Sequence, residues 1–146
     1  MALVKRDEHW YGEDQGDIRI ELIRYSELNS YLAEHFADAA CPCGSKAFRL
    51  QMDEGAGVAV RTCPTCGAEH PIGDSEDYLA DAEFEECECL CGGAIFEVTA
   101  GVALYEDSED VKWIYLGCRC VTCGLTACYG DWKNEADGYR ELLDRV

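Results

Sequence analysis

The sequence has 146 residues, which suits one compact domain or two very small ones. It holds 30 acidic and 12 basic residues, and the formal net charge of -18 argues against a nucleic-acid ligand, because such sites need clustered Lys and Arg. No apolar run approaches the roughly 20 residues that span a bilayer, and the first residues lack the apolar core of a secretion signal. We therefore expect a soluble, cytoplasmic protein with no membrane partner.

The chain contains 11 cysteines. Reducing conditions in the cytoplasm disfavour structural disulfides, so closely spaced cysteines there more often bind metal. The odd number also means that a complete pairing would leave at least one cysteine over. We therefore interpret the cysteines first as metal ligands.

The N-terminal segment, residues 1–39, is predicted to contain an arm, a strand and a helix. The opening stretch is polar and has no period, which predicts a loose or partly docked arm. The stretch DIRIELI alternates apolar and charged residues, which predicts a strand over 17–23 with one exposed face. The next stretch, YSELNSYLAEHFADAA, has apolar residues at helical spacing and predicts a helix over 25–40, with Ser26 as its N-cap.

A first cysteine-rich unit is predicted over residues 40–86. It opens with CPCG at 41–44, and CPTCG follows at 63–67. The stretches FRLQM and VAVRT between them predict a hairpin that would bring the two cysteine pairs together. The polar stretch SEDYLADAEFEE, at 75–86, predicts a linking helix.

A second, larger unit is predicted over residues 87–146 and repeats this order. Its CLCG matches CPCG at an offset of 48 positions, and its CVTCG matches CPTCG at an offset of 57, so the second copy has a nine-residue insertion. Internal repeats are a strong signal of organisation. The predicted strands cover 95–106, 111–120 and 126–132, and a helix is predicted over 134–146.

Each unit supplies four thiolates, in the order C-x-C-G, hairpin, C-x-x-C-G. Tetrahedral zinc takes four ligands, and thiolates at about 2.3 Å suit it. The glycine after each cysteine turn tolerates the positive φ that leaves backbone amides pointing at sulfur. We therefore predict two structural zinc ions per chain, one bound by Cys41, Cys43, Cys63 and Cys66 and the other by Cys89, Cys91, Cys120 and Cys123.

These units resemble zinc ribbons over about residues 40–74 and 88–131. The first turn differs from the ribbon pattern, because one residue separates its cysteines instead of two. The resemblance implies a tandem of metal-binding β-hairpins. Together with the predicted helices it gives an α+β fold, with two zinc-ribbon-like β-hairpin units flanked by short helices.

Three cysteines, Cys87, Cys118 and Cys128, fall outside both predicted ligand sets. They are interpreted as small buried hydrophobic residues, with Cys87 or Cys118 as a competing ligand as the alternative. They also leave open a thiol-redox sensor or a metal-storage protein as an alternative function. A thioredoxin-type pair is disfavoured, because its first cysteine begins a helix, whereas CPTC follows a strand-like run.

Catalysis finds little support in the sequence. The three histidines are scattered, and a site of four thiolates is closed, whereas catalytic zinc keeps an open position. We therefore expect a protein that is not an enzyme. A nucleic-acid-binding ribbon is disfavoured by the charge.

Acidic residues gather in two stretches. Eight lie between Asp74 and Glu88 with no basic residue among them, and the second group is YEDSED at 105–110. They are interpreted as solvated faces or as a docking surface for a basic protein. The tail YGDWKNEADGYRELLDRV, at 129–146, resembles the ends of small acidic bacterial immunity-like proteins. This resemblance implies an interaction module that neutralises or regulates a basic partner.

Overall fold

The computed structural model describes residues 3–146, so the first two residues of the predicted N-terminal arm lie outside the described part. The fold is mainly β, with 40% of the residues in strands and 17% in helices. The predicted α+β class is therefore wrong, because three sheets make up most of the regular structure and the predicted flanking helices are short or absent. Among residues 3–146, none of the helices combines the length and the apolar character that crossing a bilayer requires.

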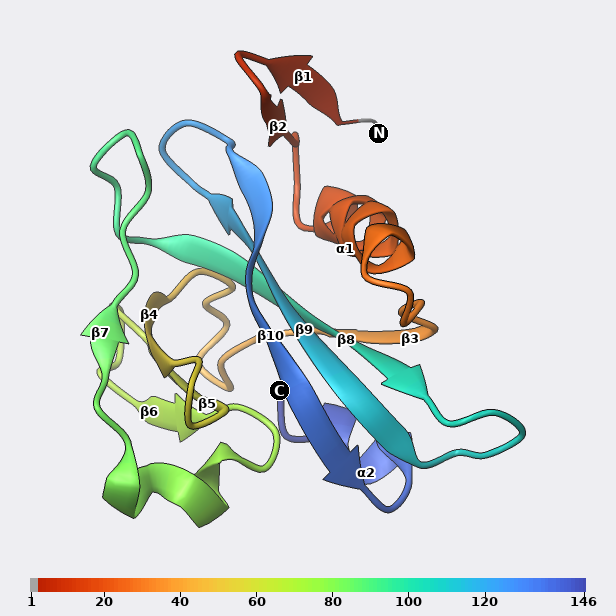
Figure 1. Ribbon diagram of the computed structural model, residues 1–146. Coiled ribbons are helices and arrows are strands. Elements are labelled where there is room, and N and C mark those ends of the chain that lie inside the picture. Colours follow the sequence, from red (N-terminus) through yellow and green to blue (C-terminus); the bar gives the residue numbers. More distant parts are fainter. Residues whose placement is uncertain (1–2) are drawn as a thin grey trace.

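The elements follow one another along the chain as labelled in Figure 1. They are β1 (Val4–Arg6), β2 (His9–Tyr11), α1 (Gly16–Leu28), β3 (His35–Asp38), β4 (Arg49–Asp53), β5 (Val58–Thr62), β6 (Glu69–Pro71), the 3-10 helix η1 (Ser75–Asp81), β7 (Glu85–Glu86), β8 (Phe96–Leu104), β9 (Val111–Cys120), β10 (Thr126–Ala136) and α2 (Tyr139–Leu143).

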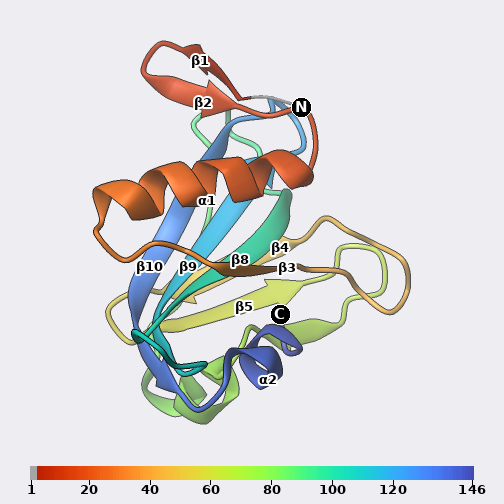
Figure 2. The ribbon, with the colours of Figure 1, turned by 90° about the vertical axis from the view of Figure 1, so that its right-hand side faces the viewer.

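Two four-stranded antiparallel sheets form the body of the molecule. Their strand orders are β10-β9-β8-β3 and β6-β5-β4-β7, and β1 and β2 form a separate hairpin. Helix α1 lies along one side of the long β8–β10 strands, and the β4–β5 hairpin lies on the other side (Figure 2). The β8–β10 sheet is therefore the middle layer, covered on both faces.

Strand β9 contributes side chains to both faces of this layer. Alternate residues of a strand point to opposite faces. Leu116 belongs to the core shared with the other sheet, whereas its neighbour Tyr115 packs with Ile18 and Leu22 of α1. Gly117 lets the helix approach closely, because a Cβ at this position would lie 2.5 Å from Ile18 Cγ2.

The two cysteine-rich units meet at positions that are 48 apart in the sequence. Phe48 and Phe96 form a reciprocal antiparallel bridge, in which each amide donates to the other carbonyl at 2.7 and 2.8 Å. Both rings are fully buried. The two units therefore share one core.

The short strands before each cysteine pair are exchanged between the units. Strand β3 precedes the first pair and joins β8 of the second unit, while β7 precedes the second pair and joins β4 of the first unit. The predicted segments 1–39, 40–86 and 87–146 stay a prediction, and β3 of the first segment pairs with β8 of the third.

The N-terminal predictions were wrong in their element types. Residues 17–23 lie in α1 instead of a strand, because Ile18 and Leu22, four residues apart, are fully buried while Ile20 is 41% exposed. The predicted helix over 25–40 stops at Leu28, and β3 follows. Ser26 lies inside α1, where its hydroxyl donates to Ile23 O and accepts from Ala33 N.

The other two predicted helices are shorter than expected. The linking segment forms η1 and then β7, and the C-terminal helix covers only 139–143. Strand β10 continues to Ala136, and Gly138 at φ +80° separates it from α2. The predicted strands over 58–62 and 111–120 are confirmed with the same bounds.

Candidate metal centres

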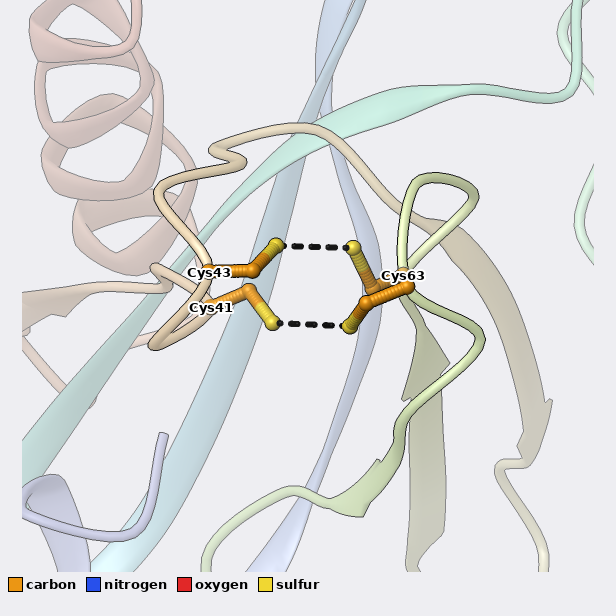
Figure 3. Close-up of side chains that lie close together, drawn as sticks. Cys41, Cys43 and Cys63 are labelled. Atoms are coloured by element: carbon orange, nitrogen blue, oxygen red, sulfur yellow. Dashed lines mark hydrogen bonds between the residues drawn. The ribbon is translucent and has the colours of Figure 1, made fainter.

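The first group of four cysteines joins two loops at one end of the β4–β5 hairpin. Cys41 and Cys43 lie between β3 and β4, and Cys63 and Cys66 lie between β5 and β6. Figure 3 shows Cys41 and Cys43 facing Cys63 across the site. The Sγ atoms of Cys41 and Cys66 are 3.6 Å apart, as are those of Cys43 and Cys63.

The second group repeats this arrangement on the middle layer. Cys89 and Cys91 lie between β7 and β8, Cys120 ends β9, and Cys123 lies in the turn to β10. The Sγ atoms of Cys89 and Cys123 are 3.6 Å apart, as are those of Cys91 and Cys120. The structure thus brings together the two sets of four that the spacing predicted.

The sulfur positions in both groups fit a four-coordinate metal ion. Within each group the four Sγ atoms lie within 4.8 Å of one another. A tetrahedron with metal–sulfur bonds of about 2.3 Å has edges of about 3.8 Å, which is close to the observed 3.6 Å. A disulfide would need about 2.05 Å, and all 11 cysteines are free thiols. Each group could therefore hold a metal ion.

The backbone of each cysteine turn is built in the same way. The glycine that follows each cysteine pair has a positive φ, as predicted, and its amide donates to the carbonyl of the pair's first cysteine at 2.8 Å. An L side chain rarely adopts this backbone conformation, so glycine is the residue that suits the turn. The four glycines are Gly44, Gly67, Gly92 and Gly124.

These turns also direct amides at sulfur. The amide of Gly93 donates to Cys91 Sγ at 3.4 Å, and that of Leu125 donates to Cys123 Sγ at 3.5 Å. The amide of Cys66 lowers the pKa of Cys63 to about 6. Burial opposes ionisation at Cys120, but the amides of the following turn lower its pKa to about 7. One sulfur of each group is thus prepared to bind metal as a thiolate.

The surroundings of the two groups differ at one pair of equivalent positions. Arg61 lies two residues before Cys63 and is only 5% exposed. Its Nε donates to Val146 O at 2.8 Å, and its guanidinium carbon lies 4.4 Å from the centre of the Phe48 ring. It forms no ion pair with an Asp or Glu side chain in the described part of the chain. The equivalent position near the second group is Cys118, which is fully buried.

The three remaining cysteines belong to neither group. Cys118 lies in the shared core, in agreement with the interpretation as a buried hydrophobic residue, while Cys87 and Cys128 are half-buried. Burial raises the pKa of the Cys87 thiol to about 11, and it also raises the pKa values of Cys118 and Cys128. Thiols held in the protonated form are poor nucleophiles, which works against a redox role.

The sequence interpretation gave no role to two buried polar residues, Arg61 and Asn134. Nothing in their local pattern distinguishes them from core or strand positions, because their partners lie far away along the chain. No family model, no curated protein and no solved structure matches this sequence.

Proposed function

We propose that each four-cysteine group binds one structural zinc ion, and that the two ions hold the shared core of a non-enzymatic protein. The observation that supports this proposal is the pair of four-sulfur groups, in each of which two Sγ–Sγ distances are 3.6 Å. Four thiolates at tetrahedral spacing suit zinc or iron–sulfur chemistry. The Sγ–Sγ distances of 3.6 Å suit a single ion better than a cluster, and zinc is the ion that four thiolates commonly hold in structural sites. A complete set also leaves no coordination position for a substrate.

Native mass spectrometry tests the metal assignment. The freshly purified protein should carry two zinc ions per chain and should lose secondary structure when a chelator removes them, because the free energy of binding a structural zinc is also folding free energy. A metal-free protein whose mass is lower by two hydrogens for each cysteine pair would contradict the assignment and indicate disulfides.

We further propose that the module binds a basic protein through its acidic surface. A groove of about 430 Å³ is lined by carboxylates from β4 and from the β7 segment, namely Asp53, Glu54, Glu83, Glu85 and Glu86. Four thiolates around one zinc ion carry a net charge of about -2, so both sites would add to the formal charge of -18. A concentrated negative field accelerates encounter with a basic surface. Such a module would act as small immunity-like proteins do, by neutralising or regulating its partner.

Charge reversal tests the interaction. In the variant Glu83→Lys/Glu85→Lys, the exposed acidic edge of the groove changes sign. Capture of a basic protein from the source cell should be strong at low salt, decline as salt screens the charges, and be lost in this variant. The matched control is Glu106→Lys/Glu109→Lys, which makes the same charge change at the β8–β9 tip. If both variants capture the partner as well as the parent chain does, the groove is only a solvated surface.

A further inference from the structure

A cavity far from both cysteine groups is built by three distant segments of the chain. Its volume is about 420 Å³, which lies in the usual range for ligand sites. Gly57 comes from the β4–β5 turn, Asp74 and Tyr78 come from the start of η1, and residues 132–135 come from the end of β10. The β4–β5 turn is at the opposite end of this hairpin from the first cysteine group.

Two buried side chains that line this cavity carry polar atoms without a partner. Trp132 is 9% exposed and Asn134 is 6% exposed. Neither the indole Nε1 of Trp132 nor the amide Oδ1 of Asn134 is hydrogen-bonded within the described residues. Buried polar groups in folded proteins nearly always have a partner. Trp132 and Asn134 line the same cavity, so a ligand bound there would supply both missing partners once its wall moves to expose the two atoms.

The two atoms are held in position by their neighbours. The indole edge of Trp132 lies against Gly57, where a Cβ would stand 3.3 Å from Nε1. The other half of the Asn134 amide is already used, because Nδ2 donates to Asp74 Oδ1 at 2.9 Å. Asn134 Oδ1 and the Asp74 carboxylate are therefore neighbouring acceptors on one wall of the cavity.

The charge around the cavity favours a cation. Asp74 forms no ion pair anywhere in residues 3–146. The one lysine of the lining, Lys133, is neutralised by Glu135 at 3.1 Å. The rings of Tyr78 and Trp132 add aromatic surface, which attracts a flat cation.

We propose that this cavity binds an arginine residue of a basic peptide. The guanidinium donates to Asn134 Oδ1 and to Asp74, and the adjoining peptide carbonyl accepts the Trp132 indole N–H. A guanidinium fits better than an ammonium group, because its planar fork reaches two neighbouring acceptors and stacks on aromatic rings. The inference rests on the proposed interaction with a basic protein, and it names one residue type that this partner presents.

Binding of this side chain requires the rim of the cavity to open. The two unpartnered atoms are closed to solvent in the structure. Tyr78 is 54% exposed, and its hydroxyl makes no hydrogen bond to the described residues. It is therefore the lining side chain best able to turn outwards.

The test is a titration of the zinc-loaded, ¹⁵N-labelled protein with the capped peptide acetyl-Gly-Arg-Gly-amide. The indole N–H signal of Trp132, identified by elimination with Trp10→Phe and Trp113→Phe, should shift in a saturable way as it gains an acceptor. The Trp113 indole already donates to Asp131 at 2.9 Å and should stay unmoved. The same peptide with citrulline, which is neutral and nearly isosteric, should bind at least about tenfold more weakly, because a charge-assisted bond is lost. Free arginine distinguishes a small-molecule site from a peptide site.

Asp74→Asn supplies the matched variant. It keeps an acceptor for Asn134 but removes the charge, so arginine-peptide affinity should fall about tenfold. Asp77→Asn makes the same charge change in η1 outside the lining and should leave the affinity unchanged.

Three outcomes would overturn the inference. They are an unmoved Trp132 signal at millimolar peptide, equal binding of the citrulline peptide, and a Trp132 N–H that contacts only an ordered water. If the peptide fails to bind while the Glu83→Lys/Glu85→Lys variant still loses a basic partner, the cavity inference fails and the proposed function stands. If the peptide binds but no basic protein is captured, the cavity stands and the proposed function fails.

Discussion

The two cysteine groups have the same sulfur geometry and the same turns, yet they lie in different surroundings. The first closes a hairpin of five-residue strands, β4 and β5, whereas the second closes strands of nine and ten residues, β8 and β9. Only the longer strands are covered by α1 within the described part of the chain. The cysteine turn therefore forms in the same way at the end of either hairpin. The length of the hairpin strands decides how much of the fold depends on that turn.

The electrostatic surroundings differ as well. Beside the first group lies the buried Arg61: burial lowers the pKa of its guanidinium, and the charges of Cys41 and Cys63 oppose that shift. The equivalent residue beside the second group is the neutral Cys118. Because four thiolates outweigh one divalent ion, we expect the first site to be stabilised by charge compensation and the second by burial and amide–sulfur bonds.

Loss of a zinc ligand should give the largest effect and should separate the two units. Cys63→Ser and Cys120→Ser should each release one zinc ion and the folding free energy that binding supplies, of order 10 kcal/mol for small zinc peptides. Because Cys120 ends the central strand of the covered sheet, Cys120→Ser should expose amides throughout β8–β10. Cys63→Ser should expose mainly β4–β6. Native mass spectrometry measures the loss of zinc, and segment-resolved hydrogen exchange measures which amides become exposed. Equal exposure of β8–β10 in the two variants would contradict the expected difference between the two units.

Arg61→Met should destabilise the first site selectively. The change keeps an unbranched stem but removes the guanidinium group, so it leaves Val146 O without its buried donor and removes the positive charge near Cys41 and Cys63. The expected cost is about 3 kcal/mol in the free energy of unfolding. In competition with a chromophoric chelator, one zinc ion should leave faster than in the parent chain while the other keeps its rate. The control Cys118→Ser changes the equivalent position near the second site. If the same zinc ion leaves faster in both variants, Arg61 does not stabilise the first site selectively.

Much of the metal-site geometry is encoded locally, which is why it could be predicted from the sequence. The spacing of Cys63 and Cys66, with glycine next, fixes a turn that needs no distant contact. The N-terminal helix could not be predicted in this way. Ile18, Ile20 and Leu22 fit a strand by alternation, but Ile18 and Leu22 also share a helix face, and the covered sheet selects the helix. The cavity could not be predicted from local sequence patterns either, because Asp74 and Asn134, which line it, are 60 positions apart in the sequence.

Gly117→Ala tests how strongly the covering helix depends on close approach to the middle layer. The added Cβ would lie 2.5 Å from Ile18 Cγ2 and 2.9 Å from Leu22 Cδ2, so these side chains or α1 as a whole must shift. Such overpacking costs about 1–3 kcal/mol, measured as a fall in the free energy of unfolding in urea. The control is Gly55→Ala, whose Cβ would meet only Asp53 Oδ1 at 3.5 Å. Equal stabilities of the two variants would show that the helix is not held by this contact.

The smallest expected difference between the two hairpins is in the coupling free energy of their ion pairs. Arg119 and Glu97 form a pair at 2.8 Å on the middle layer, with side chains 18% and 19% exposed. Arg49 and Glu86 form a pair at 3.1 Å on the other sheet, with side chains 55% and 49% exposed. Exposed pairs contribute about 0–1 kcal/mol, because water and salt screen them. Double-mutant cycles with alanine should therefore give a coupling of about 1 kcal/mol for Arg119–Glu97 and less than about 0.5 kcal/mol for Arg49–Glu86. Raising the salt concentration should reduce the second coupling more than the first, since burial protects the first pair from screening. The opposite order would mean that the smaller hairpin depends on its surface charges more than its exposure suggests.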